Sequence, residues 1–457
     1  MFGKTKSIHM VGIGGIGMSG IAEFLFNQGF TISGSDIKAS ATTHKLSKLG
    51  IKVTIGHSKQ NIPKNTDIVV FSSAVKQQNV ELLQAESQNI PIIKRAQMLA
   101  EIMRMRYGIA ISGTHGKTTT TSLVGFMLRE AGLSPTIIVG GIADNFGSSS
   151  LSGSGDYIVV EADEYDRTFL SLSPIIAGIT NIELEHRDCY KDLDELKDAF
   201  CEFANKTPFF GTVIACLEDE GVQAILPEIK REVITYGFSR QADFRAESLV
   251  MKGFATKFNL WCRGKAYGEV ELNLLGRHNV LNSLLAIALG FELGIEFSTI
   301  KRSLKNFTGV KRRLQKLGEK HGVLFFDDYG HHPTEIKTTL AGLRGVFRNR
   351  IVVLFQPHLF SRTRDFAFDF GRSFMDADVV FIAPIYAARE KKIPGVSAKL
   401  IYDAAIKSGH HNAFYIESND KICQTVSSQL KEGDILISFG AGDIYLFNEQ
   451  IIQDYKK

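Results

Sequence analysis

A glycine loop followed by a lysine–threonine pair is the part of this sequence best suited to chemistry. Residues 113–121 read Gly-Thr-His-Gly-Lys-Thr-Thr-Thr-Thr, between the apolar run 109–111 and a stretch of helical spacing at 122–129. Glycines allow backbone N–H groups to close around phosphate oxygens, and the following helix adds the dipole of its N-terminus. Lys117 would reach the β- and γ-phosphates, and the hydroxyl of Thr118 would bind Mg²⁺. The pattern therefore predicts a site for a nucleoside triphosphate.

The loop departs from the long form of this motif at one position. That form has a glycine where Ile111 stands, and the first usable glycine here is Gly113. A strand–turn–helix with a solvated lysine is the alternative interpretation, but the flanking elements and the threonine run favour the nucleotide site. The residues predicted to bind the nucleotide in this loop are Gly113, Thr114, His115, Gly116, Lys117, Thr118 and Thr119.

Acidic residues follow a second apolar run. Residues 156–160 read Asp-Tyr-Ile-Val-Val and lead into Glu161, Asp163, Glu164 and Asp166. Acids at the end of a β-branched strand are typical of the metal-holding partner of a phosphate loop. A solvated strand end is the alternative. We predict a metal ligand among these acids.

Further polar side chains follow predicted elements. His186 comes soon after the strand predicted at 175–180. By itself it fits a local hydrogen-bonding role as well as a ligand role, and its place beyond a strand end favours the ligand role. Asn279 and Asn282 stand at the start of a predicted helix, where residues three apart share a face.

A second glycine-rich loop lies near the start of the chain. A strand predicted at 7–11 is followed by Gly-Ile-Gly-Gly-Ile-Gly-Met-Ser-Gly at 12–20, an apolar helix and, after another strand, Asp36. This order is typical of a dinucleotide site whose acid binds a ribose. A structural turn and a plain cap by Asp36 are the alternatives. Strands predicted at 67–71 and 90–93 complete a small doubly wound sheet, about half of a full dinucleotide fold, which favours a mononucleotide or nucleotide sugar over NAD.

The last part of the chain repeats the order of strand, polar loop and helix. A basic joint at 309–313 precedes apolar runs at 323–326, 351–355, 379–382 and 435–439. A solvated hinge is the alternative interpretation of this basic joint. In an open parallel sheet such strand ends line one edge, and ligands bind at that edge.

Length and composition predict an ordinary globular protein of several domains. A chain of 457 residues is too long for one small core, and we expect domains at 1–106, 107–313 and 314–457. The net charge of +4 gives no reason to expect nucleic acid as a partner. The 5 cysteines are scattered, which is typical of reduced thiols. The sequence has no apolar run of membrane-spanning length and no signal-peptide pattern, so we expect a cytoplasmic protein without membrane insertion. A monomer and a homodimer both stay open.

Several classes of enzyme use a phosphate loop with downstream acids. A nucleotide module before the loop and a polar-loop domain after it suit an enzyme that brings two substrates to one ATP, which is the task of a ligase. No Asn-Lys-x-Asp motif follows the loop, which argues against a GTP switch. The first domain alone also fits an NAD-dependent oxidoreductase, but such an enzyme has no use for the run 116–118.

Taken together, these motifs closely resemble those of the Mur ligases of peptidoglycan synthesis, over essentially the whole chain. The shortened phosphate loop is the usual form in that family. The motifs that carry the resemblance are at 12–20, 113–120, 161–164, 181–183, 276–279, 327–335, 356–358 and 440–443.

The resemblance implies three α/β domains: a Rossmann-like domain for a UDP-sugar, a central P-loop ATPase-type domain for ATP and Mg²⁺, and a C-terminal Rossmann-like domain for an amino acid. It further implies an ATP-dependent ligase that joins L-alanine to the lactyl carboxylate of UDP-N-acetylmuramate through an acyl phosphate. The nearer alternative is a relative that joins a recycled murein tripeptide to the same sugar, but its glycine loop differs from residues 14–19.

The resemblance also implies roles for individual residues. Thr118 and Glu161 would hold one Mg²⁺, and His186 a second that bridges the acyl carboxylate and the γ-phosphate. The catalytic set is then Lys117, Glu161, His186 and Arg362. Beyond the loop, the residues implied to contact ATP are Asn279 and Asn282 at the adenine, with Arg313 and Asp328. Those implied to bind the alanine are Tyr329, His331 and Arg362, and those for the UDP-sugar are Gly14, Gly15, Ile16, Gly17, Met18, Ser19, Asp36 and Ser73.

The sequence departs from the family pattern at two places. Glu185 precedes His186 where the family commonly has an aspartate, a change of one methylene that could shift the second metal. Leu359 follows Gln-Pro-His where many relatives have an arginine. Arg362 should therefore carry more of the charge that recognises the amino acid, with Arg364 as the rival.

Overall fold

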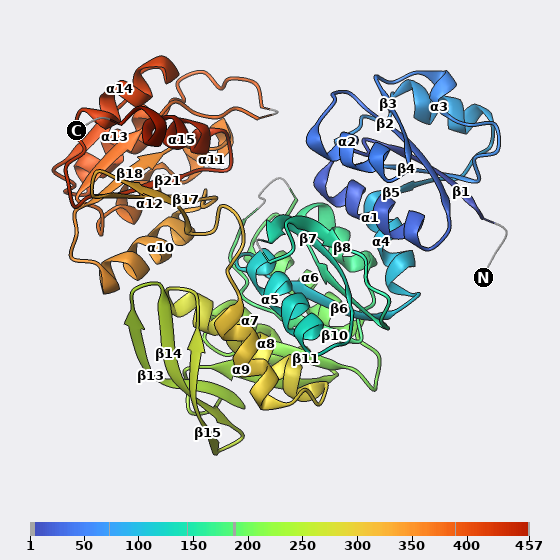
Figure 1. Ribbon diagram of the computed structural model, residues 1–457, viewed down its shortest axis with the longest axis horizontal. Helices are drawn as coiled ribbons and strands as arrows, with labels where there is room; N and C mark the ends of the chain where they lie inside the picture. Colours follow the sequence, from blue (N-terminus) through green and yellow to red (C-terminus); the bar gives the residue numbers. More distant parts are fainter. Residues whose placement is uncertain (1–4, 73, 144, 186–188, 389, 456–457) are drawn as a thin grey trace. The chain divides into compact units, whose positions relative to one another are not determined.

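The computed structural model describes residues 5–72, 74–143, 145–185, 189–388 and 390–455. Within these ranges the strands form three sheets, each accompanied by helices (Figure 1). The contacts along the chain divide it into two compact units, residues 1–249, 258–272 and 280–308 in one and residues 250–257, 273–279 and 309–457 in the other. Among the helices of the described residues, none is both long enough and apolar enough to cross a membrane.

The first sheet is a parallel, doubly wound sheet, as predicted. Its order is β3 (Lys52–Ile55), β2 (Thr31–Asp36), β1 (Ser7–Val11), β4 (Ile68–Phe71) and β5 (Ile92–Lys94). The accompanying helices are α1 (Ile16–Asn27), α2 (Ala41–Lys48), η1 (Lys59–Asn61), α3 (Val80–Ser87) and α4 (Arg95–Met103). Every residue of β1 is buried, because both faces of a central parallel strand are covered. Edge strand β3, which was not predicted, is partly exposed and lacks an apolar run.

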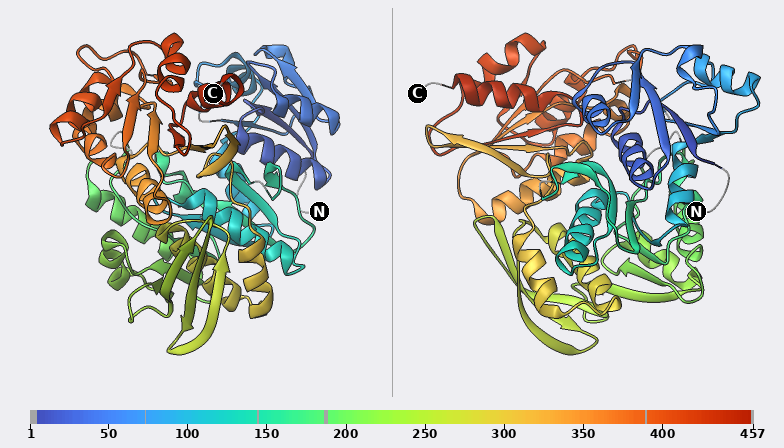
Figure 2. Two further views of the ribbon diagram at one scale, coloured as in Figure 1. Left: turned by 60° about the vertical axis from the view of Figure 1, so that its left-hand side comes forward. Right: turned by 45° about the vertical axis from the view of Figure 1, so that its right-hand side comes forward.

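The second sheet has β6 (Tyr107–Ser112) in its interior. The other strands run β15 (Lys265–Leu272), β14 (Ala255–Cys262), β13 (Phe244–Lys252), β12 (Glu232–Gly237), β11 (Thr212–Cys216) and β10 (Ile176–Ile179) on one side, and β9 (Tyr157–Glu161), β7 (Thr136–Ala143) and β8 (Ser148–Leu151) on the other. The helices are α5 (Lys117–Glu130), η2 (Tyr165–Ser171), α6 (Leu193–Asn205), α7 (Glu220–Ile225), η3 (Leu226–Glu228), α8 (Arg277–Glu292) and α9 (Phe297–Asn306). Figure 2 shows the long olive-green strands β13 to β15, which end this sheet, from two further sides.

The register of the second sheet brings the predicted strand ends to one edge. β9 and β10 lie on either side of β6, and both run parallel to it. Ile111 pairs with Glu161, and Ser112 pairs with Ile179. The loops that follow these three strands therefore leave the sheet side by side.

The third sheet is mainly parallel and contains the four strands predicted for the last part of the chain. Its order is β16 (Gln315–Lys320), β17 (Val323–Asp328), β21 (Ile435–Phe439), β18 (Ile351–Phe355), β19 (Val379–Ile382) and β20 (Ala413–Tyr415). The helices are α10 (Pro333–Val346), α11 (Phe360–Asp365), α12 (Ala367–Ser373), α13 (Lys399–Lys407), η4 (Asn419–Lys421), α14 (Ile422–Ser427) and α15 (Ile444–Asp454). Edge strands β16, which is antiparallel to β17, and β20 were not predicted.

Candidate functional site

The turn between β6 and α5 has a shape that requires glycine. Gly113 has φ +137° and Gly116 has φ +82°, a region that favours glycine. A Cβ on Gly113 would lie 1.9 Å from the Oγ1 of Thr180, and one on Gly116 would lie 2.7 Å from the Oδ1 of Asn282. The backbone of the loop therefore passes close to its neighbours and turns directly into the N-terminus of α5, as a phosphate-binding loop requires.

Residues that follow β10 fix the shape of this loop. The backbone N–H of His115 donates to the Oδ1 of Asn181 at 2.8 Å, and the hydroxyl of Thr180 donates to the His115 carbonyl at 2.7 Å. The Oγ1 of Thr114 accepts from the N–H of Glu183 at 2.9 Å and donates to its carbonyl at 3.0 Å. The sequence analysis placed 181–183 in a motif but gave these residues no role. They hold the loop in place through the neighbouring strand.

Lys117, the first residue of α5, lies at the centre of the loop. Its Nζ donates to the carbonyls of Gly113 at 2.6 Å and Thr114 at 3.1 Å, and to the Oε2 of Glu164 at 2.7 Å. Burial alone would lower the pKa of Lys117, but Glu164 and Asp163 outweigh it and raise the pKa. Burial also raises the pKa of Glu164, to about 7, against the attraction of Lys117 and with the help of Asp163. A lysine that keeps its charge suits the neutralisation of phosphate oxygens.

The predicted metal ligands Thr118 and Glu161 lie next to each other. The Thr118 hydroxyl donates to the Oε1 of Glu161 at 2.9 Å, and the other carboxylate oxygen accepts from the N–H of Gly140 at 2.6 Å. A hydroxyl oxygen beside a carboxylate oxygen is the kind of donor pair that Mg²⁺ prefers, so these residues fit that ion. His186 lies outside the described residues, and the neighbouring Glu185 is buried.

The two asparagines of α8 are both buried. The amide of Asn279 donates to the Leu275 carbonyl at 2.8 Å. Asn282 lies against Gly116, where its amide oxygen occupies the space that a side chain would need. Asn282 is therefore part of the surroundings of the phosphate loop, and adenine recognition by either residue stays a prediction.

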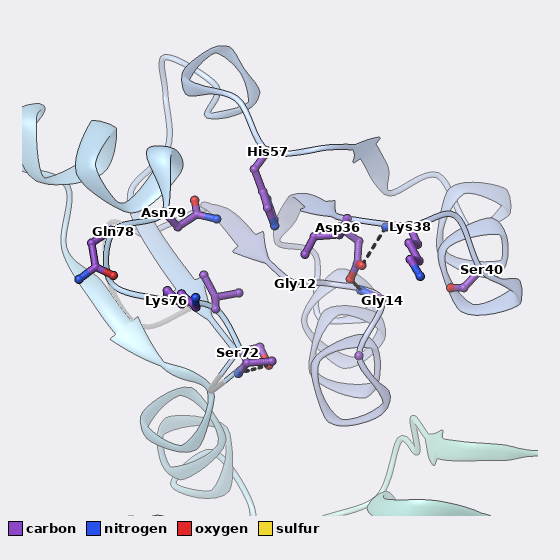
Figure 3. Close-up of a pocket in the computed structure, with 14 residues that line it drawn as sticks. Gly12, Gly14, Asp36, Lys38, Ser40, His57, Ser72, Lys76, Gln78 and Asn79 are labelled. Atoms are coloured by element: carbon purple, nitrogen blue, oxygen red, sulfur yellow. Dashed lines mark hydrogen bonds between the residues drawn. The ribbon is translucent and has the colours of Figure 1, made fainter. Parts of the chain in front are cut away.

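A separate pocket of about 640 Å³ lies among the loops that follow the strands of the first sheet (Figure 3). Gly14, Gly15 and Asp36, which were predicted to bind the UDP-sugar, are among the residues that line it. The carboxylate of Asp36 accepts from the N–H of Gly14 at 2.8 Å and from the N–H of Lys38 at 3.4 Å, so it holds the glycine loop in place. Ser73, another predicted contact, lies outside the described residues.

The remaining residues predicted from this loop are not among those that line the pocket in the described part of the chain. Met18 and Ser19 are 1% and 7% exposed, so both residues are buried, and their contact with the UDP-sugar stays a prediction. Gly17 lies against Arg95, whose Nη1 would be 2.8 Å from an added Cβ. Ile16 is the first residue of α1.

Asp328, at the end of β17, anchors backbone on both sides of it. Its Oδ1 accepts from the N–H of Gly330 and its Oδ2 from the N–H of Leu314, each at 2.7 Å. Burial raises the pKa of Asp328 to about 7, against the attraction of Arg313. Arg313 itself donates to Glu335 at 3.2 Å. Arg313 and Asp328, both predicted to contact ATP, therefore belong to one group of charges around the end of β17.

The neighbouring Arg312 is not the solvated hinge residue that the sequence left open as an alternative. Its guanidinium donates to the Oδ2 of Asp327 at 2.9 Å and to the carbonyls of Gly440 at 2.6 Å and Gly442 at 3.1 Å. It also lies 4.4 Å from the centre of the Tyr445 ring. Arg312 ties the ends of β17 and β21 together.

The residues predicted to bind the amino acid lie together at the edge of the third sheet where β17 ends. The rings of Tyr329 and His331 are 5.4 Å apart, and those of His331 and His358 are 5.7 Å apart. His358 also stacks on Tyr386 at 6.0 Å, and its Nδ1 is 3.5 Å from the Nη1 of Arg362. The sequence analysis gave no role to His358 or Tyr386, although both follow predicted strands.

The rival arginine has a different environment. Arg364 donates to both carboxylate oxygens of Asp365, at 2.7 and 3.2 Å, and half of its side chain is exposed. Its charge is thus already paired with a carboxylate. Leu359, at the start of α11, has φ +70°, an unusual conformation for a leucine, and its N–H donates to the Tyr386 carbonyl at 3.0 Å.

Comparison with known families identifies the chain over most of its length. Residues 7–107 match a family model described as the Mur ligase family catalytic domain, and residues 111–290 match the Mur ligase middle domain. Residues 312–442 match the Mur ligase glutamate ligase domain. The chain belongs to the Mur ligase family. Its three sheets with their helices correspond to the three α/β domains of Mur ligases, which confirms the predicted fold class. Membership of this family also argues against an NAD-dependent oxidoreductase.

Individual Mur ligases are similar to the chain from end to end. A UDP-N-acetylmuramate–L-alanine ligase of Geotalea daltonii is 46% identical over 457 residues, which cover 100% of both chains. One from Desulfatibacillum aliphaticivorans is 48% identical over 453 residues, which cover 99% of both. A crystal structure of the UDP-N-acetylmuramate–alanine ligase of Thermotoga maritima superposes with a TM-score of 0.82 at 30% identity, covering 98% of this chain and 99% of the other.

Proposed function

We propose that this Mur ligase joins L-alanine to the lactyl carboxylate of UDP-N-acetylmuramate, using ATP. The observation that carries the proposal is the 46% to 48% identity, over essentially full length, to proteins that bear the name of this activity. A murein peptide ligase from Psychrobacter arcticus shares the fold, with a TM-score of 0.70, but is only 24% identical. The sequence relationship therefore favours alanine over a murein peptide as the second substrate.

The reaction has two steps. A carboxylate oxygen of the lactyl group attacks the γ-phosphorus of ATP, ADP leaves, and an acyl phosphate forms. The amine of L-alanine then attacks the acyl carbon, the amide bond forms, and inorganic phosphate leaves while the nitrogen loses a proton. Neither step needs a covalent bond to the protein, so the protein contributes by positioning the reactants and neutralising charge.

The residues around the phosphate loop supply that neutralisation. Lys117 donates to the phosphate oxygens that gain charge during transfer, and Glu164 holds its ammonium group at the loop, 2.7 Å away. Thr118 and Glu161 would hold Mg²⁺, which would supply further positive charge for the transfer. A second ion at His186 is proposed from the family resemblance alone.

We further propose that the three domains divide the substrates among them. Residues 1–106 bind the UDP-sugar, 107–313 bind ATP, and 314–457 bind the amino acid. The proposed ATP contacts outside the loop are Asn279, Asn282, Arg313 and Asp328. The proposed alanine contacts are Tyr329, His331 and Arg362, and their rings and guanidinium lie close together around His358.

Release of inorganic phosphate tests this proposal. The purified protein is incubated with ATP, Mg²⁺ and UDP-N-acetylmuramate, and a panel of amino acids and peptides is added one at a time. We expect release that requires the UDP-sugar and is fastest with L-alanine. Release with a murein tripeptide but not with L-alanine would show instead that the tripeptide alternative is right. Release that is independent of the UDP-sugar would contradict both.

A further inference from the structure

A buried carboxylate lies behind the pocket of the first sheet. Glu81, in the first turn of α3, has a fully buried side chain. Its Oε2 accepts from the Ser35 hydroxyl at 2.6 Å and from the Nε2 of His9 at 3.1 Å. Its Oε1 accepts from the amide of Asn61 at 2.7 Å, and the Nδ1 of His57 is 3.3 Å from the same oxygen. One carboxylate thus joins β1, β2, η1 and the turn after β3.

Glu81 is an acceptor toward all of these groups. Burial by itself would raise the pKa of Glu81, but the hydrogen bonds from His9, Ser35 and Asn61 outweigh it and lower the pKa to about 2. The carboxylate therefore stays ionised in the working range of an enzyme. An ionised carboxylate has no proton to give, so every nitrogen that faces it must donate.

This requirement fixes the tautomer of His57. Its Nδ1 faces two oxygens, the Oε1 of Glu81 at 3.3 Å and the Oγ of Ser35 at 3.1 Å. The single proton of the Ser35 hydroxyl is already donated to Glu81. Both oxygens therefore act as acceptors, and Nδ1 must carry a hydrogen. In the neutral imidazole, Nε2 is then a hydrogen-bond acceptor.

The other end of His57 belongs to the wall of the pocket. Figure 3 shows its ring pointing into the pocket, between Asp36 and Asn79. The side chain is 16% exposed. Gly14 and Gly15 line the part of the pocket at the start of α1, where the helix N-terminus suits a diphosphate. If the diphosphate lies there, the nucleoside faces the wall that carries His57.

We propose that His57 recognises the uracil ring of the UDP-sugar by accepting a hydrogen bond from N3–H at Nε2, and that Glu81 is the positioning residue that keeps Nε2 an acceptor. This inference rests on the proposed function, which supplies a uridine nucleotide as the ligand. Uracil offers a donor at N3, whereas cytosine offers a lone pair there. An acceptor in the wall selects uracil and repels cytosine.

Calorimetric binding of UDP and CDP to the full-length protein at about pH 8 tests the inference. We expect the wild type to prefer UDP, and His57→Ala to bind UDP about tenfold more weakly while its affinity for CDP does not fall. Glu81→Gln should lose part of the preference, because an amide no longer dictates the tautomer. Asn61→Ala is the matched control. It removes another donor to the same carboxylate, and it should keep the ratio of the two affinities.

The ratio separates recognition from a merely structural role. If His57→Ala weakens UDP and CDP equally, or if the wild type has no preference, the inference is wrong while the proposed function stands. If the wild type binds neither UDP nor UDP-N-acetylmuramate, the proposed function is wrong as well. Should Glu81→Gln fail to fold, which its thermal unfolding would reveal, His57→Ala alone decides the question.

Discussion

Two glycine loops of this protein share one local plan and have different surroundings. Each follows a buried strand, β1 or β6, and leads into a helix, α1 or α5. At the second loop, the neighbouring strand ends bring Lys117, Glu161 and Glu164 together. At the first loop, the surrounding strands and turns contribute Asp36 and His57 instead. The two loops thus share a backbone plan, and we infer that the side chains from the neighbouring strands decide which chemistry each loop can carry out.

The two buried glutamates near these loops, Glu81 and Glu164, show this difference in their pKa values. Glu81 and Glu164 are each at most 1% exposed, yet their pKa values shift in opposite directions, to about 2 and about 7. Glu81 is surrounded by hydrogen-bond donors, which stabilise its charge. Glu164 is buried beside Asp163, and the attraction of Lys117 only partly offsets these effects. Hydrogen-bond donors thus stabilise the buried charge beside the pocket of the first sheet, whereas acids concentrate charge beside the phosphate loop of the second.

The largest expected effect comes from removing the cation of the second loop. Lys117→Ala should lower kcat by a hundredfold to a thousandfold, because its charge matters most as the γ-phosphate is transferred. The KM for UDP-N-acetylmuramate should stay nearly fixed. Steady-state kinetics checks both values, with the exposed Lys191→Ala as the control. Near-normal turnover in Lys117→Ala would remove the second loop from the mechanism.

The loops should also differ in their tolerance of a methyl group. Gly113→Ala places a Cβ 1.9 Å from Thr180 at φ +137°, so we expect a loss of about 2–3 kcal/mol in the free energy of unfolding. At Gly15 the φ angle is −64° and the nearest contact of a Cβ, the Gly12 carbonyl, is at 3.4 Å. Gly15→Ala should therefore cost less than about 1 kcal/mol. Urea unfolding of both variants measures this, and equal losses would contradict the account.

The lowered pKa of Glu81 predicts that the stability of the protein depends on pH. Its pKa is lower in the folded state, about 2, than the ordinary value of 4.5, so its contribution is present above pH 4.5 and is lost as the pH falls toward 2. Glu81→Gln should therefore lose about 2 kcal/mol of stability near neutral pH and less in acid. Unfolding of wild type and variant across this range is the measurement. A difference that grows as the pH falls would show that the carboxylate is not stabilised by its donors.

The smallest expected effect concerns Arg362 in the third sheet's domain, which we propose to bind the alanine. Arg362→Lys should raise the apparent KM for L-alanine about tenfold, because a lysine keeps the charge but loses the two-pronged hydrogen bonding of a guanidinium. The KM values for ATP and the UDP-sugar should remain nearly unchanged. Arg364→Lys is the matched control, since its guanidinium is paired with Asp365. Loss of alanine affinity in the control alone would transfer the role to Arg364.

Local patterns were enough to predict the strand–loop–helix units and a metal ligand among the acids after residues 156–160. The choice of Glu161 as the partner of Thr118 came from the family resemblance, and the two side chains do lie together. The strands β3, β16 and β20 were missed because edge strands are short or lack a continuous apolar run.

Contacts between distant residues could not be predicted in this way. Glu81 is 72 residues from His9 and 46 from Ser35, and their contact depends on the order of strands in the sheet. The partner of Lys117 is a similar case. The sequence showed a group of acids, but only the course of the chain after β9 selects Glu164 among them. Met18 and Ser19 are buried because α1 packs on the sheet, which the glycine motif does not reveal.

The central claim is that ATP, bound at the second glycine loop, phosphorylates the lactyl carboxylate of the UDP-sugar bound at the first glycine loop. Oxygen-isotope transfer tests it most directly. UDP-N-acetylmuramate labelled with ¹⁸O in its lactyl carboxylate is incubated with the protein, ATP and L-alanine, and the inorganic phosphate is analysed by mass spectrometry. The account predicts that a labelled oxygen appears in each phosphate released with an amide bond. Amide formation that leaves the phosphate without label would contradict an acyl phosphate, and with it the assignment of the loop.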